Sequence, residues 1–511
     1  MSASGIGYSL TRLSAVTTAT EGLLAAASVL STAYVVRRLG TEQYGIIALV
    51  TVLAGQFSLL QLGASPAAMR RLAACRARGD MNAYAATRHA AMGYGLATSL
   101  LAMVAAALTV RWAFGGGLHV SSATAALVDA AVVPAIIILG LQPLARAVGG
   151  ILQGQERLVA LVAVRLLQGL GSIGAMVLAV MLGGSAAVVL WTSAATGVVA
   201  VLLSVRAARV PDAPRVRWRD VWSALRALTA LGLPFAAVAV LSGMLVDVEK
   251  LAIALTRSVE DFTYYTVPFG AILRLSTLAS AFGVLLSPRL ARLAEAGEVD
   301  GARALTRQAT GVSLTALTIA VVPMLAVTRE LLSVWVGRDF AARATLPTRI
   351  LLVALLVNVA AYAASAALQA RAHPRVVTRL YLLEVPLHLG VVVLLVSRWG
   401  IVGAACAWAA RVVIDTLAHW WLARRTLEGP VAGTREVAMV AGAVLAAALY
   451  ELIDATVAWP LRLLTAAIVA AALLAWLLSR TVFAAVRSAD GIIPESRAEL
   501  LSVRPGNDTA G

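Results

Sequence analysis

The sequence predicts an all-α membrane protein of about fourteen transmembrane helices, built as two pseudo-symmetric six-helix lobes followed by two C-terminal helices. Three observations lead to this prediction. Of the 511 residues, 60% are hydrophobic and only 13% are charged, whereas about 25% of the residues in soluble domains are charged. The hydrophobic residues form repeated runs of membrane-spanning length. The two halves of the chain also share short motifs in the same order.

We expect each apolar run to form one span. The predicted spans are 15–36, 44–64, 89–110, 126–146, 158–182, 186–205, 231–256, 264–286, 311–328, 350–369, 376–397, 401–422, 437–454 and 461–483. The predicted parts are an N-terminal lobe (1–206), a cytoplasmic linker (207–230), a C-terminal lobe (231–423), helices thirteen and fourteen (424–486) and a disordered cytoplasmic tail (487–511).

Arginines lie mainly in the connections on one side of this topology. The connections 65–88 and 206–230 are the most basic, and 329–349 is an exception on the opposite side, with four arginines. Because basic residues remain on the cytoplasmic side, we expect both termini in the cytoplasm. The formal charge of +16 is therefore typical of a membrane topology, and we do not expect nucleic acid as a partner.

The two halves repeat each other at an offset of about 220 residues. The motif SPAAMRRLA at 65–73 returns as SPRLARLA at 287–294, and Leu152-Gln153 returns as Leu368-Gln369. Six predicted spans separate each pair, so the halves share one orientation. Such repeats are typical of transporters whose pathway lies between the halves.

Several segments resemble family motifs in the same order. The segment Val36-Arg37-Arg38-Leu39-Gly40, followed by Tyr44-Gly45, resembles the R-x-L-G-x-x-x-Y-G signature of polysaccharide transporters. These are the oligosaccharide-lipid flippases of the multidrug/oligosaccharidyl-lipid/polysaccharide (MOP) exporter superfamily. Further similar segments are Leu152–Arg157, Glu249–Leu255, Tyr264–Pro268 and Gly400–Ala405. The resemblance covers residues 10–425, and helices thirteen and fourteen match by hydropathy alone.

The resemblance implies a flippase that carries a lipid-linked oligosaccharide, usually on undecaprenyl diphosphate, in the synthesis of a cell-envelope polysaccharide such as O-antigen or exopolysaccharide. It implies a multi-pass protein of the bacterial cytoplasmic (inner) membrane that works by alternating access. Membrane lipids are expected partners, and polysaccharide polymerase machinery is a further candidate. No cofactor is expected.

Two cations within predicted spans are the leading substrate candidates. Lys250 is the only lysine in the chain, and it lies roughly 10 Å from the outer end of its span. Arg274 lies about 15 Å from the outer end of the next span, and the two could together bind a diphosphate. The alternatives are an ion pair of Lys250 with Asp247 or Glu249, outward snorkelling of Lys250, and an ion pair of Arg274 with an acid of the preceding span.

Three further residues are candidates for the translocation pathway. Glu21, in the first span, could bind a cation or proton or pair with an arginine. Arg165 lies about 10 Å into the fifth span, where snorkelling and substrate contact are both open. Arg38, at the outer end of the first span, has a structural role as its alternative.

The remaining membrane acids are candidates for ion coupling or ion pairing. Arg411 and Asp415 are four residues apart on the twelfth span, a spacing that lets them neutralise each other. Glu384 and His388 repeat that spacing on the eleventh span, and Asp247 and Glu249 precede Lys250. Either role remains open for these residues.

The sequence contains no phosphate-binding loop and no metal-ligand or catalytic-triad pattern, so neither an enzyme nor a metal site is expected. One alternative function is a cation-coupled multidrug exporter of the same superfamily, which would use buried carboxylates. Another is a membrane glycan polymerase or ligase, which would usually need a large external catalytic loop.

Overall fold

The computed structural model describes residues 3–112, 122–210, 214, 216–371, 375–454 and 456–490. Among these, the side chains of several helical stretches, including 3–19, Glu21, 277–285 and 477–490, lie outside the described set. The predicted tail beyond residue 490 lies outside it as well. All regular elements of the described residues are helices, which confirms the all-α prediction.

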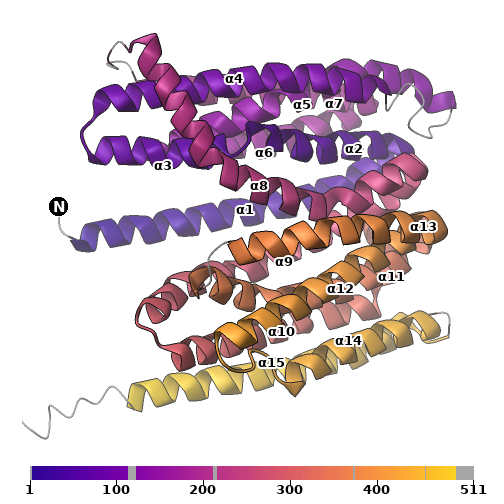
Figure 1. Ribbon diagram of the computed structural model, residues 1–511. Coiled ribbons are helices and arrows are strands. Elements are labelled where there is room, and N and C mark those ends of the chain that lie inside the picture. The colour runs from indigo at the N-terminus through magenta and orange to yellow at the C-terminus, as the bar shows by residue number, and fades with distance from the viewer. Residues whose placement is uncertain are drawn as a thin grey trace, which may run out of the picture. The chain divides into compact units, whose positions relative to one another are not determined.

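The helices follow one another with short connections (Figure 1). Their bounds are α1 (Ala3–Leu39), α2 (Thr41–Phe57), the 3-10 helix η1 (Ser58–Gln61), α3 (Ala64–Ala77), α4 (Met81–Trp112), α5 (Ser122–Gly154), α6 (Leu158–Met181), α7 (Ala186–Ala207), α8 (Trp218–Thr256), α9 (Val259–Glu295), α10 (Val299–Ala326), α11 (Thr328–Trp335), α12 (Arg338–Arg371), α13 (Arg375–Thr426), α14 (Thr434–Ile453) and α15 (Trp459–Asp490).

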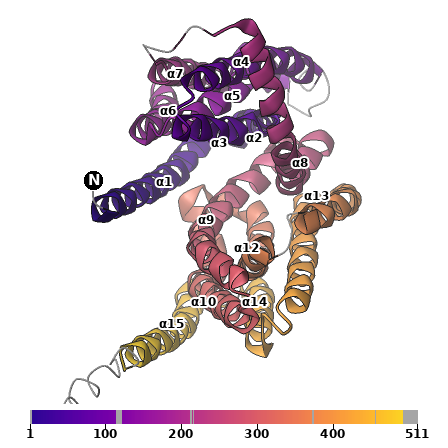
Figure 2. The same cartoon turned by 60° about the vertical axis from the view of Figure 1, so that its left-hand side comes forward.

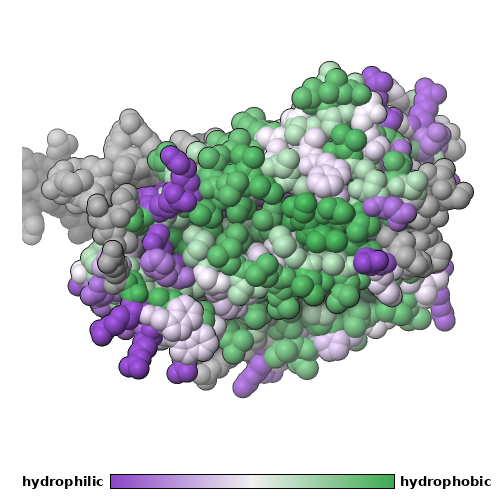
Figure 3. All heavy atoms as spheres, turned by 90° about the horizontal axis from the view of Figure 1, so that it is seen from above, coloured by the Kyte–Doolittle hydropathy of each residue, from purple (hydrophilic) through white to green (hydrophobic). Residues whose placement is uncertain are grey.

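Within the described residues, eleven helices are long and apolar enough to cross a membrane, or twelve if the bent α8 counts as one span. The face shown in Figure 3 has a broad hydrophobic region between more hydrophilic ends. Large apolar side chains are exposed along the helices, including Leu100, Leu108 and Leu182. Such a surface requires lipid as its solvent. The multi-pass membrane protein is thus confirmed, while the exact number of fourteen spans stays a prediction.

The helix α13 contains two of the predicted spans, 376–397 and 401–422. Its 52 residues are helical except at Gly400, where φ is 57° and ψ is −131°. Residues with a Cβ rarely adopt a positive φ, whereas glycine does so without steric cost. Gly400 therefore reverses the chain between the arms 375–399 and 401–426.

Several segments that the sequence presented as basic connections are helical. The helix α3 occupies most of 65–88, and α11 with the start of α12 occupies most of 329–349. The helix α8 begins at Trp218 rather than at residue 231, and it bends by 46° between Leu233 and Phe235. Proline lacks the backbone N–H that continues a helix, so Pro234 accounts for this bend. Hydropathy locates the membrane-spanning part of a helix but not its polar extensions.

The contacts divide the chain into two compact units. Unit 1 comprises Met1–Leu278, Thr328–Leu355 and Ala372–Asp415, and unit 2 comprises Ala279–Val327, Leu356–Arg371 and Thr416–Gly511. The predicted lobe boundaries are a different division and stay a prediction.

Small residues allow the helices of unit 1 to pack closely. Figures 1 and 2 show α4, α5 and α7 close together, and α5 contacts both α4 and α7. A core cluster joins α3, α4 and α5 through buried Ala67, Ala90, Ala91, Val148 and Ile151. Because lipid tails are as apolar as these side chains, close van der Waals packing rather than the hydrophobic effect holds such helices together.

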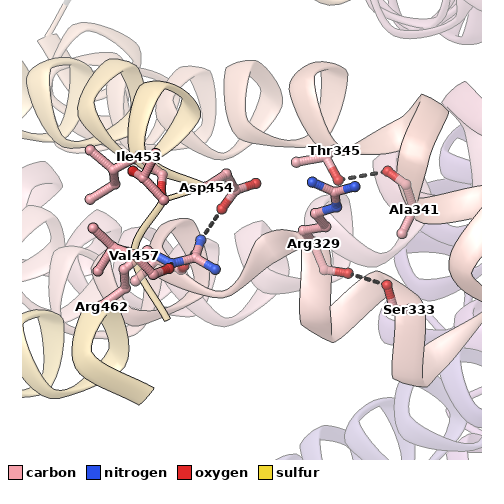
Figure 4. A network of polar contacts seen from close by, with 10 residues as sticks. Arg329, Ser333, Ala341, Thr345, Ile453, Asp454, Val457 and Arg462 are labelled. Atoms are coloured by element: carbon pink, nitrogen blue, oxygen red, sulfur yellow. Dashed lines mark hydrogen bonds and ion pairs between the residues drawn. The ribbon is translucent and has the colours of Figure 1, made fainter. Parts of the chain in front are cut away.

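The last two helices belong to unit 2 and contact α10. Arg462, at the start of α15, is only 2% exposed. It forms an ion pair with Asp454 (Figure 4). It also donates a hydrogen bond of 3.1 Å to the carbonyl oxygen of Ala326 at the end of α10. One buried arginine thus fixes the α14–α15 turn to α10.

We predict that Gly45→Ala destabilises the protein, because a Cβ there would overlap the Val259 side chain and lie 2.5 Å from the Val259 carbonyl oxygen. Such overpacking costs about 1–3 kcal/mol. Gly55→Ala, in the same helix, is the matched control, since its Cβ meets nothing within 4 Å. We expect the thermal unfolding midpoint in detergent to fall for Gly45→Ala only, and an equal effect of both substitutions would contradict the close α2–α9 approach.

Candidate functional site

Ionisable residues gather in unit 1 where α8, α9 and α13 approach one another, and we call Asp247, Glu249, Lys250, Glu384, His388 and Arg411 the charged cluster. Asp247 and Lys250 are three residues apart, so they share one face of α8. They form an ion pair, with side chains 16% and 9% exposed. The other oxygen of Asp247 accepts a 2.5 Å hydrogen bond from Gln56 Nε2 of α2. Asp247 of the same helix thus neutralises Lys250, and this ion pair is one of the alternatives that the sequence left open.

The ammonium group of Lys250 lies over an aromatic ring that packs against two further rings. Its Nζ lies 4.5 Å from the centre of the Phe269 ring, within the range of a cation–π interaction. Phe269 stacks on Tyr265 at 5.5 Å and meets Trp408 edge-on at 5.2 Å. Sequence reasoning missed these aromatic residues and Gln56, although Phe269 and Tyr265 lie one helical turn apart on one face of α9.

Glu249 lies one residue before Lys250 and therefore points in a different direction from α8. Its carboxylate is completely buried and faces His388 of α13, with His388 Nε2 2.9 Å from Glu249 Oε1. The contact does not have hydrogen-bond geometry, and neither Glu249 oxygen accepts a hydrogen bond from a described residue. This is the most deeply buried acid–base contact in the charged cluster.

Arg411 pairs with Glu384 across the Gly400 reversal of α13. The Arg411 Nη1 lies 3.4 Å from Glu384 Oε1, and both side chains are less than a tenth exposed. Asp415, the partner that the spacing suggested, is buried one turn beyond Arg411. The two arms of α13 are thus joined by an ion pair inside the protein.

Arg274 differs from the other cations of the spans. Its Nη2 donates a 2.6 Å hydrogen bond to Ser28 Oγ of α1, and its Nη1 donates one of 3.1 Å to the carbonyl oxygen of Gly270. Within the part of the chain that the structure describes, both partners are neutral. Lys250 and Arg274 therefore have separate partners, and their joint binding of a diphosphate stays a prediction.

The other pathway candidates lie elsewhere in unit 1. Arg165 is exposed on α6, and Arg38 is exposed at the end of α1, 5.8 Å from the centre of the Tyr34 ring. Glu21 is part of α1, but its side chain lies outside the described residues.

The motif residues at helix ends have structural contacts. Gly40 has a φ of 82° and ends α1, and Arg37 donates a hydrogen bond to the carbonyl oxygen of Val334 in α11. Nearby, Trp335 Nε1 donates a 3.0 Å hydrogen bond to the carbonyl oxygen of Val29. These contacts attach α1 to α11. In this motif the arginine thus supplies a contact between helices, and the glycine ends α1.

No family model matches the chain. A protein of Shigella flexneri, described as "Putative O-antigen transporter", is 23% identical over 186 residues. The match covers 36% of this chain and 44% of that protein, so the chain spans less than half of this relative.

Solved structures match much more of the chain. The lipid II flippase MurJ in an inward closed conformation has a TM-score of 0.68 at 12% identity, covering 93% of this chain and 100% of that one. An inward-facing multidrug resistance MATE family transporter of the MOP superfamily has a TM-score of 0.61 at 15% identity, covering 78% and 93%. The chain has the MOP-superfamily fold. This confirms the fold that the motifs implied, and the sequence relative agrees with their resemblance to polysaccharide transporters.

We predict that the Glu384–Arg411 pair stabilises the MOP fold of this chain as a unit. Arg411→Leu removes the cation beside a buried carboxylate, which costs about 3–5 kcal/mol, whereas replacing both partners by leucine is close to neutral. The measurement is the thermal unfolding midpoint in detergent. Glu260→Gln is the control, because the Glu260–Arg343 pair is 43% and 59% exposed and such pairs contribute about 0–1 kcal/mol. A double variant as unstable as Arg411→Leu would contradict the pairing.

Proposed function

We propose that the chain is a flippase that moves a polyprenyl-diphosphate-linked oligosaccharide from the inner to the outer leaflet by alternating access. The observation that carries the proposal is the surroundings of Arg274, a cation within α9. Its hydrogen bonds go to neutral groups, and the fold around it is that of MOP-superfamily transporters. A cation without a counter-charge in a low-dielectric region favours an anionic ligand. A diphosphate that enters the pathway would supply that charge.

The similar proteins support the same cargo class. One relative is described as an O-antigen transporter, and the fold extends over the whole of a lipid II flippase. We infer an undecaprenyl diphosphate carrier, an O-antigen or exopolysaccharide repeat unit as the glycan, and polysaccharide polymerase machinery as a downstream partner. We further propose that the chain lies in a bacterial inner membrane with both termini in the cytoplasm, which the basic residues of α3 support because such residues remain on the cytoplasmic side.

A second candidate is a cation-coupled multidrug exporter, which the MATE-type structure favours. Such an exporter needs a carboxylate available to a cationic drug. In the charged cluster, Asp247 and Glu384 are ion-paired and Glu249 faces His388. The acids of this cluster are therefore engaged, which favours the anionic cargo.

The test is reconstitution of the purified chain into vesicles of phosphatidylethanolamine and phosphatidylglycerol that contain a fluorescent polyprenyl-diphosphate oligosaccharide. The proposal expects this lipid to become accessible to a membrane-impermeant glycosidase on the opposite leaflet, and it expects no transport of cationic dyes. Dye transport without lipid transport would establish the exporter, and growth of the glycan would establish the polymerase.

We predict that Arg274→Ala lowers the flipping rate by tenfold or more, because a hydrogen bond to a charged group contributes about 1.5–3 kcal/mol. Lys250→Ala is expected to impair flipping as well, because it leaves the carboxylate of Asp247 without its counter-charge. Arg217→Ala is the matched control, since this arginine is 89% exposed at the start of α8. Monodisperse elution of each variant shows that it is folded, and wild-type flux from both pathway variants would contradict their role.

A further inference from the structure

An open groove of about 360 Å³ lies between α9 and α10, within unit 2. The helix α9 contributes Leu286 and Arg289, which are three residues apart and therefore share one face. The helix α10 contributes Leu305, Ala309 and Val312, whose spacing also places them on one face. The volume lies within the range of about 300–1,000 Å³ that is typical of ligand sites.

The polar groups of the groove lie toward the short connection between the two helices. The helix α9 ends at Glu295 and α10 begins at Val299. By rise per residue, Arg289 lies about 9 Å before the end of α9, and Leu305 lies about 9 Å after the start of α10. Val312 lies about 20 Å after that start. The cationic group is thus near the connection, and the apolar lining continues away from it.

Arg289 gives this end of the groove a positive charge. Its side chain is exposed, and its guanidinium forms no ion pair or hydrogen bond with any residue that the structure describes. Gln308, which also lines the groove, is exposed as well, and its amide can donate hydrogen bonds. Because a guanidinium binds a phosphate through two N–H groups, this end suits a phosphate, whereas the remaining lining suits a hydrocarbon chain.

We propose that the groove binds one anionic phospholipid of the surrounding membrane, with its phosphate at Arg289 and one acyl chain along α10. From Leu305 to Ser313, the last lining residue, the groove extends about 12 Å along the helix. This length is close to one leaflet, which is half of a hydrocarbon core about 30 Å thick.

The predicted topology agrees with this occupant. The sequence places the α9–α10 connection in the cytoplasm, and basic pockets between helices on that side bind anionic lipid head groups. The proposed cargo fits the groove less well, because a polyprenyl chain is much longer than the groove and an oligosaccharide needs more polar groups than Arg289 and Gln308. The inference therefore does not rest on the proposed function.

The first test is native mass spectrometry of the purified full-length protein titrated with dioleoylphosphatidylglycerol. We expect one molecule to bind more tightly than dioleoylphosphatidylethanolamine does. Arg289→Ala should weaken this binding by about tenfold, because it removes hydrogen bonds to a charged group. Arg292→Ala is the matched control, since this arginine is exposed on the same helix and does not line the groove. Equal binding of the two lipids, or equal weakening by both substitutions, overturns the proposal.

The second test asks whether the acyl chain occupies the groove. Val312→Trp fills the apolar part without a change of charge and should weaken binding of phosphatidylglycerol as Arg289→Ala does. Glycerol 1-phosphate, which has the charged head without the chains, should not displace the lipid from the wild type, and this measurement needs no substitution. Displacement by glycerol 1-phosphate at the concentration of the lipid overturns the proposal, as does wild-type affinity in a folded Val312→Trp variant.

The third test separates the phospholipid from the cargo. The proposal expects a polyprenyl-diphosphate oligosaccharide to leave phosphatidylglycerol bound at this site. One-for-one displacement from the wild type would assign the groove to the cargo and overturn the proposal. All these measurements record binding without transport. A chain that binds phosphatidylglycerol through Arg289 but moves no oligosaccharide lipid would contradict only the proposed function.

Discussion

Exclusion of net charge from the hydrocarbon region is the constraint on which the interior of unit 1 depends. A charge at the centre of a helix span costs about 2.5–3.5 kcal/mol even on the most lenient scale. The charged cluster nevertheless contains a lysine, an arginine and three acids. Lys250 meets Asp247 on the same face of α8, and Arg411 meets Glu384 of the other arm of α13. The two arms of α13 must therefore pack together for the second pair to form.

Backbone breaks make that arrangement possible. Gly400 reverses α13, so Glu384 on one arm faces Arg411 on the other. A residue with a Cβ would be strained at this positive φ. Phe269 of α9 lies by the lysine and packs against Trp408 of α13. Gly400, which has no charge itself, thus brings Glu384 and Arg411 together.

The sequence predicts the membrane class and the transporter fold well, because both follow from hydropathy and from motifs in a fixed order. The spacing of ionisable residues predicts ion pairs well only within one helix. Asp247 and Lys250 share a face at a spacing of three, and this was one of the expected alternatives. Arg411 also meets Glu384 of the other arm, a contact that its spacing from Asp415 does not indicate. That contact depends on the geometry at Gly400, which no periodicity reveals.

Hydrogen bonds between helices that are distant in the sequence could not be predicted either. Gln56 reaches Asp247 from α2, and Ser28 reaches Arg274 from α1. Polar side chains of this kind occur throughout the spans, so nothing distinguishes these two in advance.

The three cations of the α8–α9–α13 region have different electrostatic surroundings, and this difference bears on selectivity. Lys250 and Arg411 already have carboxylate partners, so an anion would gain little there without breaking an ion pair. Among the described side chains and backbone groups, the hydrogen-bond partners of Arg274 are a hydroxyl and a carbonyl oxygen, which orient the guanidinium but do not neutralise it. Orientation without neutralisation suits transient binding, because the anion gains a positioned donor and does not displace a fixed counter-charge. Under the proposed function, a neutral or cationic cargo gains nothing at Arg274, and this arginine would select the anionic cargo. The ion pairs of Lys250 and Arg411 would instead contribute to the stability of the surrounding helices.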